Sequence, residues 1–420
     1  MPGSPQVTPA LLPAEASPAA VVDRTPPPSF TPRLVSLDTL RGFDMFWIMG
    51  GDMILRSLPK IHDSAFTRAL AGQMEHCEWA GFHFYDLIFP LFVFVVGVSL
   101  VFSIGRMLER SGRLVTLKRI FIRSVVLFLL GIFYMGGISN GFKNIYFAGV
   151  LHRIAVAYFF TAIVFVAVHP LLGERAGVRG TATSDNQRFM RKLPRLPNNR
   201  FGLLILITLC AFLLIGYWIL MTFVSVPGIG APSLAGPGKN LAHYIDDLYL
   251  PGRRFEGTLL STMAAVANCL LGVFAGLLLK NSDLPNQKKV YWLLADGALC
   301  LAVGFLWSLQ FPIIKLLWTS SYVLVACGYS AILLAIFVQI IEIWNFRRWA
   351  QPFVWLGMNA ITIYITANVA NFQRLALRFV GGDVRALLGN YADLAQAILA
   401  TAFAFCVVSF LYRRKIFLRL

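Results

Sequence analysis

Apolar runs of about 20 residues recur along the chain, and they constrain the fold more than any other feature. Each run is long enough to cross the hydrocarbon core of a bilayer as a helix. Such a segment must be helical or part of a closed barrel, because lipid offers no partner for an open backbone group. The 420 residues are 57% hydrophobic and only 14% charged, which leaves too little polar surface for a soluble protein. We therefore expect an all-α, polytopic membrane helical bundle.

We predict about ten transmembrane helices, with both termini in the cytoplasm. The expected spans are residues 35–56, 82–104, 119–138, 147–168, 201–224, 259–279, 290–309, 316–343, 352–370 and 394–412. The connections 57–81 and 225–257 would lie outside, and the basic connection 169–200 would lie inside. Neither half of the sequence repeats the other, which disfavours a transporter built from internal repeats.

The distribution of Lys and Arg sets this orientation. The chain has 37 of these residues and a formal net charge of +17. With the N-terminus inside, 24 of them fall in cytoplasmic segments and 11 on the opposite side, while Arg41 and Arg153 fall within spans. This bias is the positive-inside pattern of membrane proteins, so the positive charge requires no nucleic-acid partner.

Residues 1–32 are predicted to form a disordered, Pro-rich arm, because they hold nine prolines and little apolar content. They lack the basic start and compact apolar core of a signal peptide. Residues 33–420 are expected to form the transmembrane domain. Five of the six cysteines lie in apolar spans, and Cys77 alone lies in an outer loop, so no disulfide is predicted.

The first span carries ionisable residues, which are costly in a membrane and usually face a bundle interior or an aqueous cavity. At about 100° per residue, Asp38, Arg41 and Asp52 share one helix face, whereas Asp44 lies to the side. Asp38 and Arg41 are three residues apart and can pair. A structural ion pair and a functional role are equally open for Asp38 and Arg41. For Asp52, near the outer mouth, function is favoured.

A second polar cluster lies at the start of the second span. If that helix begins before His76, then His76, Trp79, His83 and Asp86 share one face. Histidine is the natural general base near neutral pH, although a loop histidine is often simply solvated. The location beside Asp52 favours function here. We predict no metal site, because the spacing is not a familiar ligand pattern.

Two further polar residues fall in apolar spans. Arg153 needs a carboxylate partner, which Asp86 or Asp38 could supply. Asn359 could hydrogen-bond either a ligand or another helix. The basic inner loops could hold the phosphates of a nucleotide-bearing donor, or they could be plain positive-inside charge.

Several motifs, in order along residues 33–412, resemble the heparan-α-glucosaminide N-acetyltransferase family. They are Ser36-Leu37-Asp38-Thr39-Leu40-Arg41-Gly42, His76-x-x-Trp79-x-Gly81, Asp86-Leu87-Ile88-Phe89-Pro90, Phe92-Val93-Phe94-x-x-Gly97, Leu317-Trp318-Thr319-Ser320-Ser321-Tyr322-Val323 and Gly357-Met358-Asn359-Ala360. The bacterial branch of this family includes proteins described as N-acetylglucosamine-related transporters.

The resemblance implies a transmembrane acyltransferase that moves acetyl from cytoplasmic acetyl-CoA to an amino sugar on the lumenal or periplasmic side. His76 matches the position of the family's catalytic histidine. Asp52 falls where the lysosomal enzyme carries an asparagine that works with that histidine. The large lumenal domain and the leading span of the lysosomal enzyme have no counterpart here, which favours a small sugar or cell-envelope glycan as acceptor.

We therefore predict an acyltransferase of the bacterial inner membrane with His76 as general base and Asp52 as its partner. Residues expected along the substrate and donor channel are Asp38, Arg41, Trp79, His83, Asp86, Arg153 and Asn359. Expected partners are the lipid bilayer, acyl-CoA and a sugar or glycan acceptor, and a homodimer remains open. The main alternative is an amino-sugar transporter, and a third is a non-catalytic partner in an envelope complex.

Cysteine labelling tests the predicted orientation. Ser64→Cys falls in the connection 57–81 and Ser184→Cys in the connection 169–200. We expect a membrane-impermeant thiol reagent outside the membrane to label the first variant only, after the signal of the parent protein is subtracted. Labelling of Ser64→Cys from the inside alone would reverse the orientation and the side on which His76 lies.

Overall fold

Helices make up the regular structure in the part of the chain that the computed structural model describes, namely residues 3, 34–137, 139, 141–172, 200–250 and 258–417. The predicted arm 1–32, apart from Gly3, and most of the inner connection 169–200 lie outside these residues. Leu34–Leu420 forms one unit. The expectation of an all-α membrane protein is confirmed.

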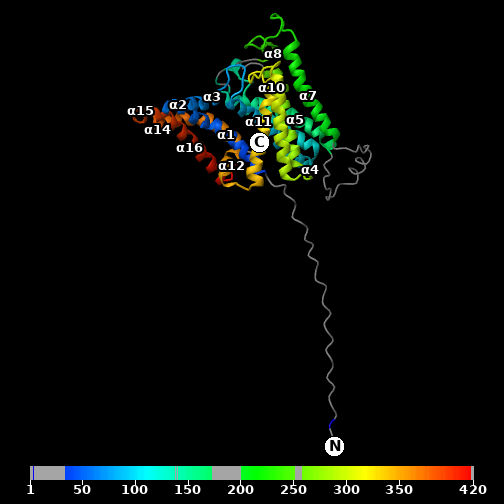
Figure 1. Ribbon diagram of the computed structural model, residues 1–420. Helices are drawn as coiled ribbons and strands as arrows, with labels where there is room; N and C mark the ends of the chain where they lie inside the picture. The colour runs from blue at the N-terminus through cyan, green and yellow to red at the C-terminus, as the bar shows by residue number, and fades with distance from the viewer. Residues whose placement is uncertain are drawn as a thin grey trace. The chain divides into compact units, whose positions relative to one another are not determined.

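Figure 1 shows the helices of the described chain in order from the N-terminus to the C-terminus. They are α1 (Val35–Phe46), a π-helical turn (Trp47–Gly51), α2 (Asp52–Ile61), α3 (Ala65–Gln73), α4 (Phe84–Tyr134), α5 (Val150–Val168), α7 (Arg200–Phe223), α8 (Leu241–Tyr249), α9 (Thr258–Lys280), α10 (Asn286–Ser308), α11 (Ser320–Val338), α12 (Gln351–Met358), α13 (Ala360–Ala370), α14 (Phe372–Val380), α15 (Gly382–Leu388) and α16 (Ala392–Arg413).

Among the described residues, 7 helices are long and apolar enough to cross a bilayer, or 8 if the bent pair α12–α13 counts as one span. The chain is thus polytopic, with fewer such helices than the ten we predicted. Two places account for much of the difference. Helix α4 is one long helix although it covers two predicted spans. Helix α1, with 12 residues, is too short to be among the candidate spans.

Helix α4 reverses direction at Gly112, whose φ of 73° breaks the helix. A straight helix of 51 residues would be ~77 Å long, far beyond a bilayer core of ~30 Å. The start of α5 lies beside the second arm, because a Cβ at Gly131 would meet the His152 ring at 2.8 Å. The end of α5 lies beside the first arm, because a Cβ at Gly105 would lie 3.8 Å from His169 Nε2. The two arms therefore run antiparallel and match the predicted spans 82–104 and 119–138.

The first predicted span, 35–56, is not one straight helix. A π-helical turn follows α1, and Gly50 within it has a φ of 129°, which only glycine adopts readily. The angular count that placed Asp38 and Asp52 on one face assumed a regular helix, so it fails beyond Gly50. The predicted contact between Asp38 and Arg41 is present, because Arg41 Nη1 lies 3.1 Å from Asp38 Oδ1. Arg41 also donates a hydrogen bond to the Ser99 hydroxyl.

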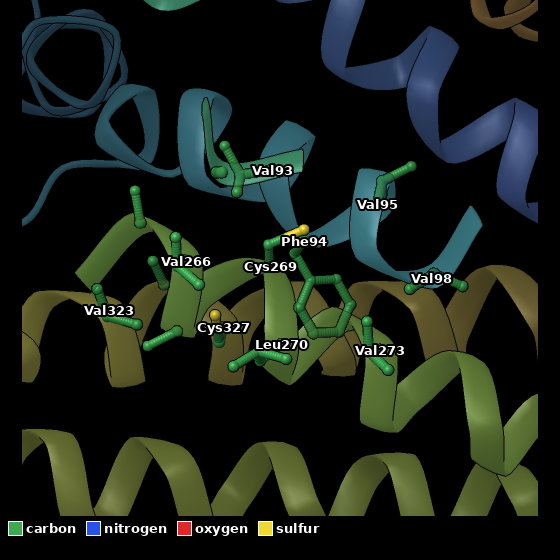
Figure 2. Packing of buried hydrophobic residues seen from close by; sticks show 14 of the residues in the cluster. Val93, Phe94, Val95, Val98, Val266, Cys269, Leu270, Val273, Val323 and Cys327 are labelled. Carbon is green, nitrogen blue, oxygen red and sulfur yellow. The ribbon is translucent and has the colours of Figure 1, made fainter. Parts of the chain in front are cut away.

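Glycines let neighbouring helices pack closely around the core. Figure 2 shows the Phe94 ring of α4 beside Leu270 and Val273 of α9. A Cβ at Gly97 would lie 2.0 Å from a carbonyl oxygen of α9. One at Gly272 would lie 2.0 Å from the Phe94 carbonyl oxygen. Small residues at such crossings are typical of membrane helices, which gain stability from close van der Waals contact.

The buried apolar residues form two clusters. The larger one joins α4, α5, α7, α9 and α11, whereas the smaller one joins the π-helical turn to α12, α13, α14 and α16. Figure 1 shows α14, α15 and α16 next to α2, apart from α5 and α7. Phe92 of α4 packs against both clusters, so the first arm of α4 runs along the boundary between them.

Substitution of Gly272 tests this close packing. We expect Gly272→Ala to destabilise the protein by ~1–3 kcal/mol, because the new methyl group overlaps the Phe94 carbonyl. Gly216→Ala in α7 is the matched control, since its Cβ would meet only the Met263 methyl carbon at 3.7 Å. Thermal unfolding in detergent measures both. Equal transition temperatures for the two variants would contradict the packing.

Candidate functional site

The site is built on the loop between α3 and α4, which contains residues 74–83. Helix α4 begins at Phe84, close to the predicted start of the span 82–104, so the condition for His76 to share a helix face with Asp86 is not met. Gly81 has a φ of 138°, outside the helical region, and its N–H donates to Ile313 O at 2.9 Å. That bond fastens the loop to residues 309–319, which connect α10 and α11. The side chains of His76 and Asp86 therefore meet through a folded loop rather than on one helix face.

Asp86, in the first turn of α4, is the residue that the loop closes around, and its side chain is 0% exposed. One oxygen, Oδ1, lies 2.9 Å from His76 Nδ1 and 3.2 Å from Lys315 Nζ. The other, Oδ2, accepts hydrogen bonds from the backbone N–H groups of His83 at 3.0 Å and Cys77 at 3.2 Å. The bond from His83 also caps the N-terminus of α4. All four acceptor positions of the carboxylate are thus in use.

Lys315 is a site residue that our sequence reasoning missed, because it counted only as one of the outer positive charges. Its ammonium lies 2.8 Å from His76 Nδ1 and 3.4 Å from Nε2. Burial lowers the pKa of this ammonium, which Asp86 partly offsets. Lys315 and His76 are 239 positions apart, so no local pattern links them. The motif Leu317–Val323, which begins two residues after Lys315, was the one available signal.

A cavity of about 430 Å³ opens beside this cluster. Its polar wall includes His76, Cys77, Lys315 and Arg153, and no Asp or Glu is among the described residues that line it. The rest is mainly apolar or aromatic and includes residues from both clusters: Met45, Ile48, Phe89, Phe92, Leu151, Ile154, Trp318, Ala360 and Tyr364. The His76 side chain is 54% exposed, so its ring remains accessible from this side.

Arg153 lacks the carboxylate that we predicted for it. Within the described chain, neither Asp86 nor Asp38 forms an ion pair with it, because Asp86 is occupied by Lys315 and His76, and Asp38 by Arg41. Its guanidinium instead lies over the Trp318 ring, 4.5 Å from the centroid. A cation–π contact of this kind stabilises a charge that is largely removed from water.

Trp79 and His83 hold the loop in place through hydrogen bonds and do not line the cavity. Trp79 Nε1 donates to Leu234 O at 2.7 Å, which ties the loop to the connection after α7. His83 Nδ1 lies 3.0 Å from Glu75 O. Both side chains are thus explained by local structure.

Asp52 and Asn359 lie near the site without lining the cavity. Asp52 is buried in the first turn of α2 and interacts electrostatically with His76, but the carboxylate hydrogen-bonded to His76 belongs to Asp86. Asn359 is buried between α12 and α13, next to the cavity residue Ala360. Its Nδ2 lies 3.4 Å from Trp355 O.

Ligand atoms of Cys77, His83 and Asp86 lie within 4.8 Å of one another, a spacing that could hold a metal ion. The donor set does not suit one. Both Asp86 oxygens already accept two contacts each, and the Lys315 ammonium lies 3.2 Å from Oδ1. A cation would have to displace these donors and lie close to another positive charge. We therefore assign no metal to these residues.

Comparison with known proteins identifies two relatives of this chain, although no protein-family model matches it. Heparan-alpha-glucosaminide N-acetyltransferase from Homo sapiens is 26% identical over 439 residues, which cover 92% of this chain and 60% of the human protein. The enzyme of the same name from Mus musculus is 26% identical over 392 residues, covering 82% and 56%. The chain thus spans less than two thirds of the length of either relative. It is a distant homologue of this family, as its motifs predicted.

Cys77 lies next to His76 in the cavity wall, so its reactivity bears on the chemistry of the site. Burial raises the pKa of its thiol to about 11, and the Asp86 carboxylate adds to this effect. At neutral pH the residue is therefore almost wholly protonated. The thiolate is the nucleophilic form of cysteine, so Cys77 is poorly suited to carry an acyl group.

Alkylation of Cys77 by iodoacetamide tests this assignment. In the folded protein we expect the rate to rise about tenfold per pH unit up to about pH 11, following the thiolate fraction. In SDS-unfolded protein the rate should level off near pH 9, the ordinary value. Peptide mass spectrometry measures both rates. A folded-state rate that levels off below pH 8 would restore Cys77 as a candidate nucleophile.

Proposed function

We propose that this distant homologue of heparan-alpha-glucosaminide N-acetyltransferases is a transmembrane acyltransferase with His76 as its general base. It would transfer an acetyl group, or another acyl group, from cytoplasmic acyl-CoA to an amino sugar or glycan on the periplasmic side of a bacterial inner membrane. One observation carries the proposal: an imidazole that is hydrogen-bonded to a fully buried carboxylate faces a mainly apolar cavity.

The contact with Asp86 suits His76 to act as a base. We assign the ring proton to Nδ1, because an ionised carboxylate is a stronger acceptor than an imidazole nitrogen. Nε2 then holds the lone pair, and Asp86 stabilises the imidazolium that forms when Nε2 takes a proton. Asp86 thereby fills the orienting role that we had predicted for Asp52. Asp52 would act on His76 through space or help to bind the acceptor.

In the proposed reaction, both substrates bind together. His76 Nε2 accepts a proton from the acceptor amine while the amine nitrogen attacks the thioester carbonyl carbon. A new C–N bond forms and the C–S bond breaks. The CoA thiolate leaves and takes the proton from the imidazolium, which returns His76 to its starting state. No covalent acyl-enzyme is needed, in keeping with the protonated thiol of Cys77.

The cavity walls suit the reacting end of an acyl-CoA. Apolar and aromatic side chains such as Phe89, Leu151 and Tyr364 can pack along an acyl-pantetheine group. Arg153 would face polar groups of the ligands, since it lines the cavity beside Trp318. Asp38 and Arg41 would support the helices around the donor path, and Asn359 would support the wall beside Ala360.

Replacement of His76 tests the function directly. Purified wild-type protein should transfer labelled acetyl from acetyl-CoA to at least one member of a panel of amino sugars. His76→Ala should lower the rate by roughly 10²–10⁴-fold, the usual contribution of a general base, while it still folds and binds acetyl-CoA. His62→Ala is the matched control, because His62 is exposed and lies outside the cavity.

Two results would contradict the proposal. One is unchanged transfer by His76→Ala. The other is uptake of an amino sugar into vesicles by the wild-type protein without acetyl-CoA and without any transfer, which would support the transporter alternative.

A further inference from the structure

We propose that Lys315 is a catalytic residue that donates a hydrogen bond to the oxyanion formed when the acceptor attacks the thioester carbonyl. This inference rests on the proposed acyl transfer. It assigns a role to a residue that neither the sequence motifs nor the family relationship singles out.

The ammonium lies where such a donor is needed. It contacts the His76 ring at 2.8 Å and 3.4 Å, and Lys315 lines the cavity. The attacking nitrogen must lie within hydrogen-bond reach of His76 Nε2, and the carbonyl carbon must lie within bonding reach of that nitrogen. The carbonyl oxygen therefore falls close to the ammonium, which has N–H groups left after its contact with Asp86 Oδ1 at 3.2 Å.

Lys315 is held in place by the surrounding backbone and is not a freely solvated surface lysine. Only 19% of its side chain is exposed. In the same loop, the Thr319 hydroxyl accepts from Ile314 N–H at 3.0 Å and donates to Pro312 O at 2.8 Å. Trp318 is buried with a φ of 53°, an uncommon conformation for a residue with a side chain. A donor fixed before the reaction stabilises an oxyanion without a reorganisation cost.

The role of the ammonium in the reaction is electrostatic. When the amine nitrogen bonds to the carbonyl carbon, the C=O electron pair moves to oxygen, which becomes negatively charged. The Lys315 N–H group hydrogen-bonds to this oxygen and keeps its own proton. When the C–S bond breaks, the electron pair on oxygen re-forms the carbonyl, and Lys315 is unchanged. The proton of the amine still travels through His76 to the CoA thiolate.

The charged neighbours give the proposal a pH signature. Asp86 hydrogen-bonds to His76, Tyr85 lies against its ring, and Cys77 and Asp52 are nearby. The pKa of Lys315 itself is lowered by burial. Lys315 therefore loses its charge at a lower pH than a solvated lysine does. Because the neutral amine is a weaker hydrogen-bond donor to the oxyanion, the rate should fall at alkaline pH, which gives the pH profile an alkaline limb.

Steady-state kinetics of Lys315→Met and Lys315→Arg test the assignment, with one acceptor throughout so that its own titration is constant. We expect Lys315→Met to lower kcat by ~10²–10³-fold with an unchanged KM for acetyl-CoA, the effect of a lost oxyanion donor. Lys315→Arg should retain part of kcat and move the alkaline limb to higher pH, since a guanidinium stays charged.

Lys239→Met is the matched control, because Lys239 is exposed and lies outside the cavity. Its kcat and pH profile should equal those of the wild type. An unchanged kcat in folded Lys315→Met would overturn the role of Lys315 while leaving the acyltransferase proposal intact. If Lys315→Met fails to fold, an alkaline limb that stays in place in Lys315→Arg overturns it equally. No transfer by the wild-type protein would overturn both proposals.

Discussion

The buried carboxylate of Asp86 is the interaction on which the site depends. A fully buried charge costs several kcal/mol unless donors and a counter-charge compensate it. Asp86 receives these from three parts of the chain: the loop of His76 and Cys77, the N-terminus of α4 at His83, and the ammonium of Lys315. The hydrogen bonds and the ion pair of this one carboxylate therefore couple three structural features. These are the fold of the loop, the start of α4 and the position of the α10–α11 connection.

Contacts within the helical core fix the position of this carboxylate. Gly97 and Gly272 bring α4 and α9 into close contact, and α11 packs against both. From α11, the Tyr322 hydroxyl donates to the Asp86 backbone carbonyl at 2.8 Å. Each of these helix contacts fixes the first turn of α4, which in turn sets where the Asp86 side chain points. Packing far from the cavity thus determines the geometry around His76.

The features that sequence predicted well are those with a local signature. Apolar runs predicted the membrane helices, and a spacing of three residues predicted the contact between Asp38 and Arg41. Helical periodicity failed at Gly50 and before Phe84, because a π-helical turn and a positive φ at Gly81 interrupt the regular helix there. Lys315 and the stacking of Arg153 on Trp318 arise from tertiary contacts between distant segments, which no local pattern encodes.

The charge of the cavity bears on the choice between transfer and transport. Lys315 and Arg153 line it and no described carboxylate does, whereas Asp86 pairs with Lys315 from behind the wall. Two cationic side chains at the wall disfavour a protonated amino sugar beside them, so they would hinder a path for that cation. The same field favours the neutral amine, which is the nucleophilic form, and lowers the free energy of negative charge on a carbonyl oxygen or a departing thiolate. The same positive side chains that would impede permeation by an ammonium therefore suit the proposed acyl transfer.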